Sequence, residues 1–346
     1  MATMLASNRA TGPDSTGRIR RGTFGGARVS KIDAFLGNLR GKMATPLQVR
    51  VVSSIDGGAR TWLNRATGAA VRAFLVMIVV VLPSVILPGI GTDTRQIVAL
   101  VALFAGGLVF VEYNAIYPSL VEFRDGAPFN RIRYLMLLAI VLFLSVIVAD
   151  REDPTTVSGL FRALGDVIGQ ALDFPYSPVR LATLMLADDA TADQLRDLRT
   201  SAGTAYLLSL LSLAVFVIVL KLAGWPSTKN AFNVWVNLPT FEPTAGGDVV
   251  DRLERDARVN LGIGFLLPFL VPALIATATS GLPAAAVTSP QPLIWTAAAW
   301  AFLPASLLMR GVAMARVADM IRVKRARKIA SDAGEAVGDF EDEAGR

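Results

Sequence analysis

Six long runs of apolar residues, almost free of charge, constrain this chain more than any other feature of its sequence. They are Ala69–Ile90, Ile97–Tyr117, Ile132–Val148, Thr204–Leu222, Leu261–Ala278 and Leu293–Met309. Each holds about 17 to 22 residues, which as a helix reach about 26 to 33 Å and match a hydrocarbon core of about 30 Å. Lipid offers backbone groups no partner, so each run is expected to be helical. The predicted fold is all-α: a polytopic membrane protein with a bundle of about six transmembrane helices.

The absence of cysteine and histidine excludes whole classes of chemistry. Thiol nucleophiles, thiolate–zinc sites and iron–sulfur clusters need cysteine. Imidazole metal ligands and Ser-His-Asp hydrolysis need histidine. The sequence therefore predicts no cofactor and no metal. An enzyme would have to use carboxylate, lysine, arginine or tyrosine side chains alone, and we favour a protein without enzymatic activity.

Basic residues are distributed unevenly among the segments that join the runs. If the N-terminus is cytoplasmic, segments 1–72, 118–133, 221–260 and 310–346 share that side and hold 28 of the 34 Arg and Lys residues. Cytoplasmic segments carry such an excess, and two basic termini require an even number of crossings. We expect a bacterial inner (cytoplasmic) membrane protein with both termini in the cytoplasm. The mitochondrial inner membrane is the alternative, because the arginine-rich, acid-poor N-terminal region has the composition of a transit peptide.

The apolar runs divide the chain into five parts. These are a basic cytoplasmic N-terminal region (1–68), transmembrane helices one to three (69–148), an extracytoplasmic loop region (149–203), transmembrane helices four to six with a cytoplasmic loop at 223–260 (204–312), and a basic helix with an acidic tail (313–346). In the first part, apolar residues between Val29 and Met43 have helical spacing. This spacing predicts a short amphipathic helix, with a disordered tail as the alternative.

The loop region 149–203 is predicted to be helical but not to span the membrane. Its apolar residues trace one helical face: Val157, Leu160, Phe161, Leu164, Val167, Ile168 and Ala171. We expect this amphipathic helix to lie on the outer leaflet or to cap the bundle. A second helix is expected over Thr191–Arg199. On the other side of the membrane, the alternating residues Phe232–Phe241 predict a strand-like or interfacial stretch, and Asp248–Arg258 a charged helix that runs into the fifth span.

Glu112 is the one acidic residue well inside an apolar run, and Tyr113, Asn114 and Tyr117 lie beside it. A carboxylate within a membrane is costly, and it therefore indicates a candidate proton or cation site. The alternative is a carboxylate near the interface, paired with Arg131, Arg133 or Arg72.

A basic run continues the last apolar run. It consists of Arg316, Arg322, Lys324, Arg325, Arg327 and Lys328. Each basic residue near an anionic leaflet contributes about 1 kcal/mol of binding, so we expect the run to contact anionic lipids at the cytoplasmic face. Nucleic acid is disfavoured, because no aromatic residues interleave the basic ones as a stacking platform would require.

Three functions are compatible with these features. The first is a non-enzymatic scaffold, anchor or assembly partner of a membrane complex, with a membrane-protein partner or a second copy of the chain bound to it. The second is a small transporter or channel that uses Glu112 and helices broken by proline, at Pro83 in the first run and at Pro268 and Pro272 in the fifth. The third is a membrane enzyme with carboxylate chemistry. We favour the scaffold, because the spans are poor in charge.

Overall fold

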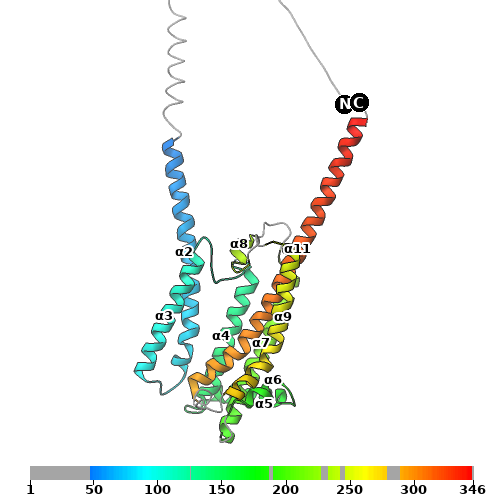
Figure 1. Cartoon of the computed structure of the whole chain (residues 1–346). Coiled ribbons are helices and arrows are strands. Elements are labelled where there is room, and N and C mark those ends of the chain that lie inside the picture. Colours follow the sequence, from blue (N-terminus) through cyan, green and yellow to red (C-terminus); the bar gives the residue numbers. More distant parts are fainter. Residues whose placement is uncertain are drawn as a thin grey trace, which may run out of the picture. The chain divides into compact units, whose positions relative to one another are not determined.

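The structure, a computed structural model, describes residues 47–124, 126–186, 190–226, 233–241, 246–278 and 289–344 (Figure 1). The chain divides into two compact units, Met1–Trp62 and Leu63–Arg346. In the first unit only the helical backbone from residue 47 onward is described, so the amphipathic helix expected near Val29–Met43 lies outside the described residues. The candidate sites described below lie in the second unit.

The described residues form helices, turns and loops, without a strand. The helices are α2 (Leu47–Ile86), α3 (Thr92–Asn114), α4 (Ala127–Ala149), α5 (Thr156–Leu172), α6 (Pro178–Thr183), α7 (Ala192–Ala223), α8 (Val234–Asn237), α9 (Val249–Ala278) and α11 (Pro290–Ala344).

Six segments of these helices are long and apolar enough to cross a membrane. They are Asn64–Ile86, Thr92–Asn114, Pro128–Ala149, Ala192–Ala223, Val249–Ile275 and Pro290–Asp332. The shortest has 22 residues, which at 1.5 Å per residue reach about 33 Å. Each contains most of one apolar run of the sequence, so the predicted all-α polytopic bundle is confirmed. The protein is a multi-pass membrane protein.

The core of the second unit is built around α11, which packs against α9, α7 and α4. Its small residues, such as Ala298 and Ala301, are buried at these contacts. Glycines let α9 and α11 approach closely at two points. A Cβ atom on Gly264 of α9 would lie 2.9 Å from the carbonyl oxygen of Pro304, and one on Gly311 of α11 would lie 2.9 Å from that of Ala257. Small residues at helix contacts are the usual means of packing helices in lipid.

The loop region 149–203 folds at one end of the bundle, which we call the α5 end (Figure 1). The expected helices are present, but the helix expected over Thr191–Arg199 is not separate. It is the first part of α7, which continues into the fourth span as one helix. Thr191 and Gln194 begin α7 with a capping box, and no proline follows to end the helix before the apolar run.

The opposite end of the bundle, the α8 end, contains the loop between α3 and α4 (Figure 1). Where a strand-like or interfacial stretch was expected, the chain forms the single helical turn α8. The amide of Phe123 donates to the carbonyl oxygen of Asn237 at 2.6 Å and joins the loop to this turn. The Phe123 ring is buried, with its centroid 4.6 Å from that of Phe129 and 5.7 Å from that of Trp225. This aromatic cluster fixes the start of α4.

Candidate functional site

A cavity of about 740 Å³ lies between α2, α3, α4 and α11, near the α8 end. Its polar lining residues are Arg72, Tyr113, Glu122, Asn130, Arg131, Arg133 and Tyr134. The rest of the lining is mostly apolar and includes Val76, Val109, Leu137 and Phe302. Ligand sites in proteins commonly combine such a size, an apolar wall and a few polar groups.

Arg133 brings a positive charge into the bundle. It is the sixth residue of the span Pro128–Ala149, so its Cα lies about 8 Å inside the end of that segment. Its Nε donates to Ser306 Oγ on α11 at 3.3 Å. Its guanidinium also lies over two aromatic rings, 5.1 Å from the centroid of Phe129 and 5.7 Å from that of Phe302. Cation–π contacts of this kind hold the guanidinium in place.

Arg72 enters the cavity from α2. Its guanidinium lies 4.7 Å from the ring centroid of Tyr113 on α3, and its Nη1 donates to the carbonyl oxygen of Gly68 at 2.7 Å. The Tyr134 hydroxyl donates to the carbonyl oxygen of Leu75 at 3.1 Å and ties α4 to α2 beside the cavity. Three spans therefore contribute to one basic, aromatic wall.

The arginines of the cavity have no carboxylate within ion-pair distance in the described part of the chain. Eight arginines elsewhere form ion pairs with Asp or Glu: Arg151, Arg162, Arg180, Arg196, Arg199, Arg310, Arg322 and Arg325. Arg72 contacts a backbone carbonyl and the Tyr113 ring, and Arg133 contacts a hydroxyl and two rings, as far as the described residues go. The cavity therefore has an excess of positive charge.

Glu122 lines the cavity, but its charge is already neutralised by Arg310. The two side chains form a bidentate pair, in which Arg310 Nε lies 2.5 Å from Oε2 and Nη2 lies 2.8 Å from Oε1. Thr240 Oγ1 donates to Glu122 Oε1 at 2.7 Å, and Arg310 Nη1 donates to Asn260 Oδ1 at 2.8 Å. Paired, planar contacts of this kind are among the stronger polar contacts in proteins. The cluster joins the α3–α4 loop to α9 and α11.

Glu112 and its neighbours do not converge on one point. The Glu112 side chain is buried and accepts four hydrogen bonds from the loop after α3: from the Ser119 hydroxyl at 2.5 Å, from the Ser119 and Leu120 amides at 2.9 Å, and from the Val121 amide at 3.2 Å. Tyr113 lines the cavity, whereas Tyr117 is exposed. Asn114 Oδ1 is buried without a hydrogen-bond partner. The carboxylate therefore folds the loop back onto the end of α3.

Part of the basic run of α11 forms ion pairs with acidic residues at the start of α9. Arg325 Nη1 lies 2.7 Å from Asp248 Oδ2, and Arg322 pairs with Glu254 and with Asp319. The Val250 amide and the Arg325 guanidinium lower the pKa of Asp248 below its ordinary value. Arg316 and Lys324 are half-buried, and Arg327 and Lys328 are exposed. Ion pairs thus attach this part of α11 to α9, and Arg327 and Lys328 remain exposed on its surface.

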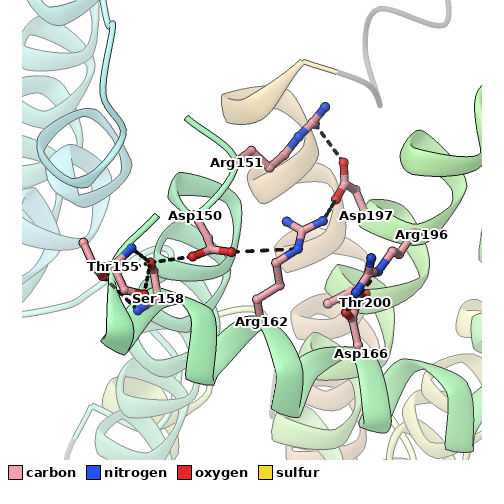
Figure 2. A network of polar contacts seen from close by, with 9 residues as sticks. All are labelled: Asp150, Arg151, Thr155, Ser158, Arg162, Asp166, Arg196, Asp197 and Thr200. Atoms are coloured by element: carbon pink, nitrogen blue, oxygen red, sulfur yellow. Dashed lines mark hydrogen bonds and ion pairs between the residues drawn. The ribbon is translucent and has the colours of Figure 1, made fainter. Parts of the chain in front are cut away.

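A second polar network lies at the α5 end (Figure 2). Arg162 of α5 is at its centre: its Nη2 donates to Asp197 Oδ1 of α7 at 2.7 Å, and its Nε lies 4.0 Å from Asp150 Oδ2. Arg151 Nη1 reaches the other oxygen of Asp197 at 2.8 Å. Ser158 donates to Asp150 Oδ1 at 2.7 Å. The alternation of acids and arginines joins α5 to the ends of α4 and α7.

Asp166 continues this network along α5 (Figure 2). It accepts from Arg196 Nε at 3.0 Å and from the Thr200 hydroxyl at 2.5 Å. Burial by itself raises the pKa of Asp166, but the hydrogen bonds from Arg196 and Thr200 outweigh it, and the pKa lies below its ordinary value. Asp166 is therefore ionised at neutral pH and is fully engaged by α7.

The buried face of α5 is its polar and small-residue face. Ser158, Gly165, Asp166 and Gly169 are buried, and a Cβ on Gly203 of α7 would lie only 2.6 Å from the Gly169 Cα. The apolar stripe of α5 points away from the bundle. Its exposed side chains are Val157 (61% exposed), Leu160 (59%), Leu164 (53%) and Val167 (67%). Phe161 and Ile168, which the sequence places on the same face, are only partly exposed.

The cavity is the feature that sequence reasoning missed. Arg72, Tyr113 and Arg133 lie far apart in the sequence, and only the packing of three helices brings them together. One signal was present: Arg133 is the only charged residue in the apolar run Ile132–Val148. Acidic clusters that could hold a metal ion are absent from the described residues. Comparisons of the chain with protein-family models, with curated proteins and with solved structures found no match, so its function is inferred from the residues and their geometry.

Proposed function

We propose that this multi-pass membrane protein is a non-enzymatic scaffold or assembly partner of a membrane complex. The observation that supports this proposal is the outward-facing apolar stripe of α5, formed by Val157, Leu160, Leu164 and Val167. The stripe lies outside the six segments that could cross a membrane. Contiguous apolar surfaces mark interaction sites, whereas apolar residues that are exposed singly do not.

The attachment of α5 to the bundle favours a protein partner for this stripe. Ion pairs at Arg162 and Asp166, together with the glycine contact between Gly169 and Gly203, hold the helix in a fixed orientation. A rigid surface loses little conformational freedom on binding. Each Val or Leu side chain that a partner fully buries contributes about 1.5–3 kcal/mol. The stripe therefore offers both a fixed shape and a driving force.

The polar networks support a scaffold over an enzyme with carboxylate chemistry. Asp150, Asp166 and Asp197 are held by arginines and hydroxyls at the α5 end. Glu122 is held by Arg310 at the α8 end. A carboxylate engaged by a guanidinium is a weak base, because the positive charge stabilises its ionised form. These carboxylates are suited to joining helices.

A transporter built on Glu112 is less well supported. Both oxygens of that carboxylate accept hydrogen bonds from the loop 119–121, and Glu112 is not part of the cavity wall. The prolines expected to break the fifth span lie inside the continuous helix α9. Pro272 has no N–H to bond the Pro268 carbonyl oxygen, and Trp300 Nε1 donates to that oxygen instead at 3.2 Å. The carbonyl that Pro272 would leave exposed is therefore occupied.

We also infer the orientation from charge. The α8 end joins the segments that carry most of the basic residues, so we place that end and both termini in the cytoplasm of a bacterium, with the α5 end outside. In this orientation the α5 stripe faces partners on the extracytoplasmic side.

The test is co-purification combined with crosslinking from the stripe. We expect the full chain, extracted in mild detergent, to carry a stoichiometric partner that crosslinks to probes placed at Leu160 and Leu164. Leu160→Ser with Leu164→Ser should release that partner. Leu103→Ser on α3, where the side chain is similarly exposed at 67%, is the matched control and should retain it.

Two results would count against the scaffold. One is repeated isolation of the protein alone from mild detergent. The other is quenching of a fluorophore at Leu164 by brominated lipids, with no crosslink to protein, which would show that the stripe lies against the outer leaflet.

A further inference from the structure

We infer that the cavity between α2, α3, α4 and α11 binds one anionic phospholipid, with its phosphate held by Arg72 and Arg133 and an acyl chain lying along the deeper wall. This inference concerns the α8 end and does not depend on the proposed scaffold surface at the α5 end.

The charge of the cavity is the first reason. Arg72, Arg131 and Arg133 line it without a carboxylate partner among the described residues, and the one acidic residue in the lining, Glu122, is paired with Arg310. A positive charge inside a membrane-spanning segment is costly unless an anion or a polar group compensates it. Guanidinium groups bind phosphate oxygens with paired hydrogen bonds. An anionic headgroup would therefore supply the missing partner.

The order of polar and apolar residues along each helix is the second reason. On α2 the lining residue one helical turn deeper than Arg72 is Val76, and on α4 the one deeper than Arg133 is Leu137. On α3, which runs the opposite way, Val109 lies one turn deeper than Tyr113. Residues four apart share a helix face. All three walls therefore change from polar to apolar in the same direction, toward the middle of the membrane.

The depth of the polar groups fits a phospholipid. Arg133 is the sixth residue of its span, and Tyr113 is the second-last residue of Thr92–Asn114. At 1.5 Å per residue these two positions lie within about 8 Å of the helix ends, and Arg72, the ninth residue of Asn64–Ile86, lies about 12 Å from the end of its segment. Arginine and tyrosine side chains at such positions reach the boundary between headgroups and acyl chains. A soluble anion would use the arginines but would leave the apolar wall at Val76, Val109 and Leu137 without a role.

The experiment is a lipid titration of the purified full-length protein, followed by native mass spectrometry. We expect one saturable adduct with phosphatidylglycerol and a much weaker one with phosphatidylcholine. Arg133→Gln and Arg72→Gln should each weaken phosphatidylglycerol binding by about tenfold or more, which corresponds to one charge-assisted hydrogen bond. Arg255→Gln removes an exposed cation of α9 outside both the cavity and the basic run, and it should leave the affinity unchanged.

A second pair of variants tests the chain-binding wall without changing any charge. Val109→Trp fills the deeper part of the cavity and should abolish the adduct. Val111→Trp, two residues along on the exposed side of α3 (63% exposed), is the matched control and should bind as the parent protein does. Monodispersity and thermal stability of each variant show that the fold is retained.

Three outcomes would overturn the inference. Equal binding of phosphatidylcholine and phosphatidylglycerol would remove the role of the arginines. Unchanged lipid affinity in Arg133→Gln or in Val109→Trp would place the lipid elsewhere. Saturable binding of inorganic phosphate that blocks no lipid and that Val109→Trp leaves intact would assign the arginines to a free anion.

Discussion

The crossing of α5 over α7 can be tested by adding a single methyl group. Gly203→Ala places a Cβ 2.6 Å from the Gly169 Cα and 3.0 Å from the Gly169 amide nitrogen. Both are backbone atoms, so no side chain can rotate out of the way, and the two helices must separate. Overpacking of this kind costs about 1–3 kcal/mol, and a backbone clash belongs near the upper end of that range.

The same substitution also has a favourable effect, which must be subtracted. Alanine in a helix interior is more favourable than glycine by about 1 kcal/mol. We therefore expect Gly203→Ala to lower the free energy of unfolding by about 2 kcal/mol. Gly107→Ala in α3 is the matched control, because a Cβ there would meet no atom within 4 Å. It should be neutral or stabilising by up to about 1 kcal/mol.

The assay is reversible unfolding in mixed micelles of mild detergent and dodecyl sulfate, followed by circular dichroism. The two alanine variants should differ by about 2–3 kcal/mol, although their chemical change is identical. Equal stability of Gly203→Ala and Gly107→Ala would refute the close contact of α5 with α7. A destabilised Gly107→Ala would show that the loss in Gly203→Ala is not specific to the helix crossing.

Three further predictions concern charge. Glu122→Gln leaves Arg310 without its counter-charge and should destabilise the protein by about 2 kcal/mol. This is less than the cost of about 3–5 kcal/mol for breaking a fully buried pair, because Arg310 is 25% exposed. Adding Arg310→Met to Glu122→Gln should recover part of the loss in the same unfolding assay. Because the pKa of Asp166 is lowered in the folded state, its contribution to stability is complete above its unfolded pKa of about 3.9 and is lost as the pH falls through the folded value. The free energy of unfolding should therefore fall as the pH is lowered below about 4. Asp166→Asn should weaken this dependence of stability on pH, and an unchanged dependence would contradict the network. The chain has no cysteine, so single cysteines at Thr191 and Ser227 should react with an impermeant maleimide from opposite sides of the membrane, and labelling of both from one side would refute the orientation.

The six spans were predictable because lipid leaves the backbone only one way to satisfy its hydrogen bonds. The length and low charge of each run therefore determine both the helix and its approximate ends. The continuity of α7 was harder to predict. Apolarity alone places the start of the span near Thr204 and leaves the helix expected over Thr191–Arg199 separate, whereas one helix runs from its cap, Thr191, into the span.

The orientation of α5 and the cavity could not be predicted from one sequence. The apolar stripe of α5 suggests a face turned toward the bundle or the lipid. Gly165 and Gly169, however, allow the closest approach on the other face, and Asp166 finds its partners there. For the cavity, the hydrophobic pattern locates Arg133 within a span but contains no information on which helices surround it. Those neighbours depend on packing between residues distant in the sequence.

One continuous helix, α11, runs from the wall of the cavity to the ion pair of Arg325 with Asp248. Phe302 of α11 lines the cavity, and Ser306 accepts a hydrogen bond from Arg133. Arg325 of the same helix forms an ion pair with Asp248, which directly precedes α9. The 24 residues from Phe302 to Arg325 form about 35 Å of continuous helix. A bound protein, or loss of the ion pair between Arg325 and Asp248, could rotate this end of α11. Because the helix is continuous, the rotation would also move Phe302 in the wall of the cavity.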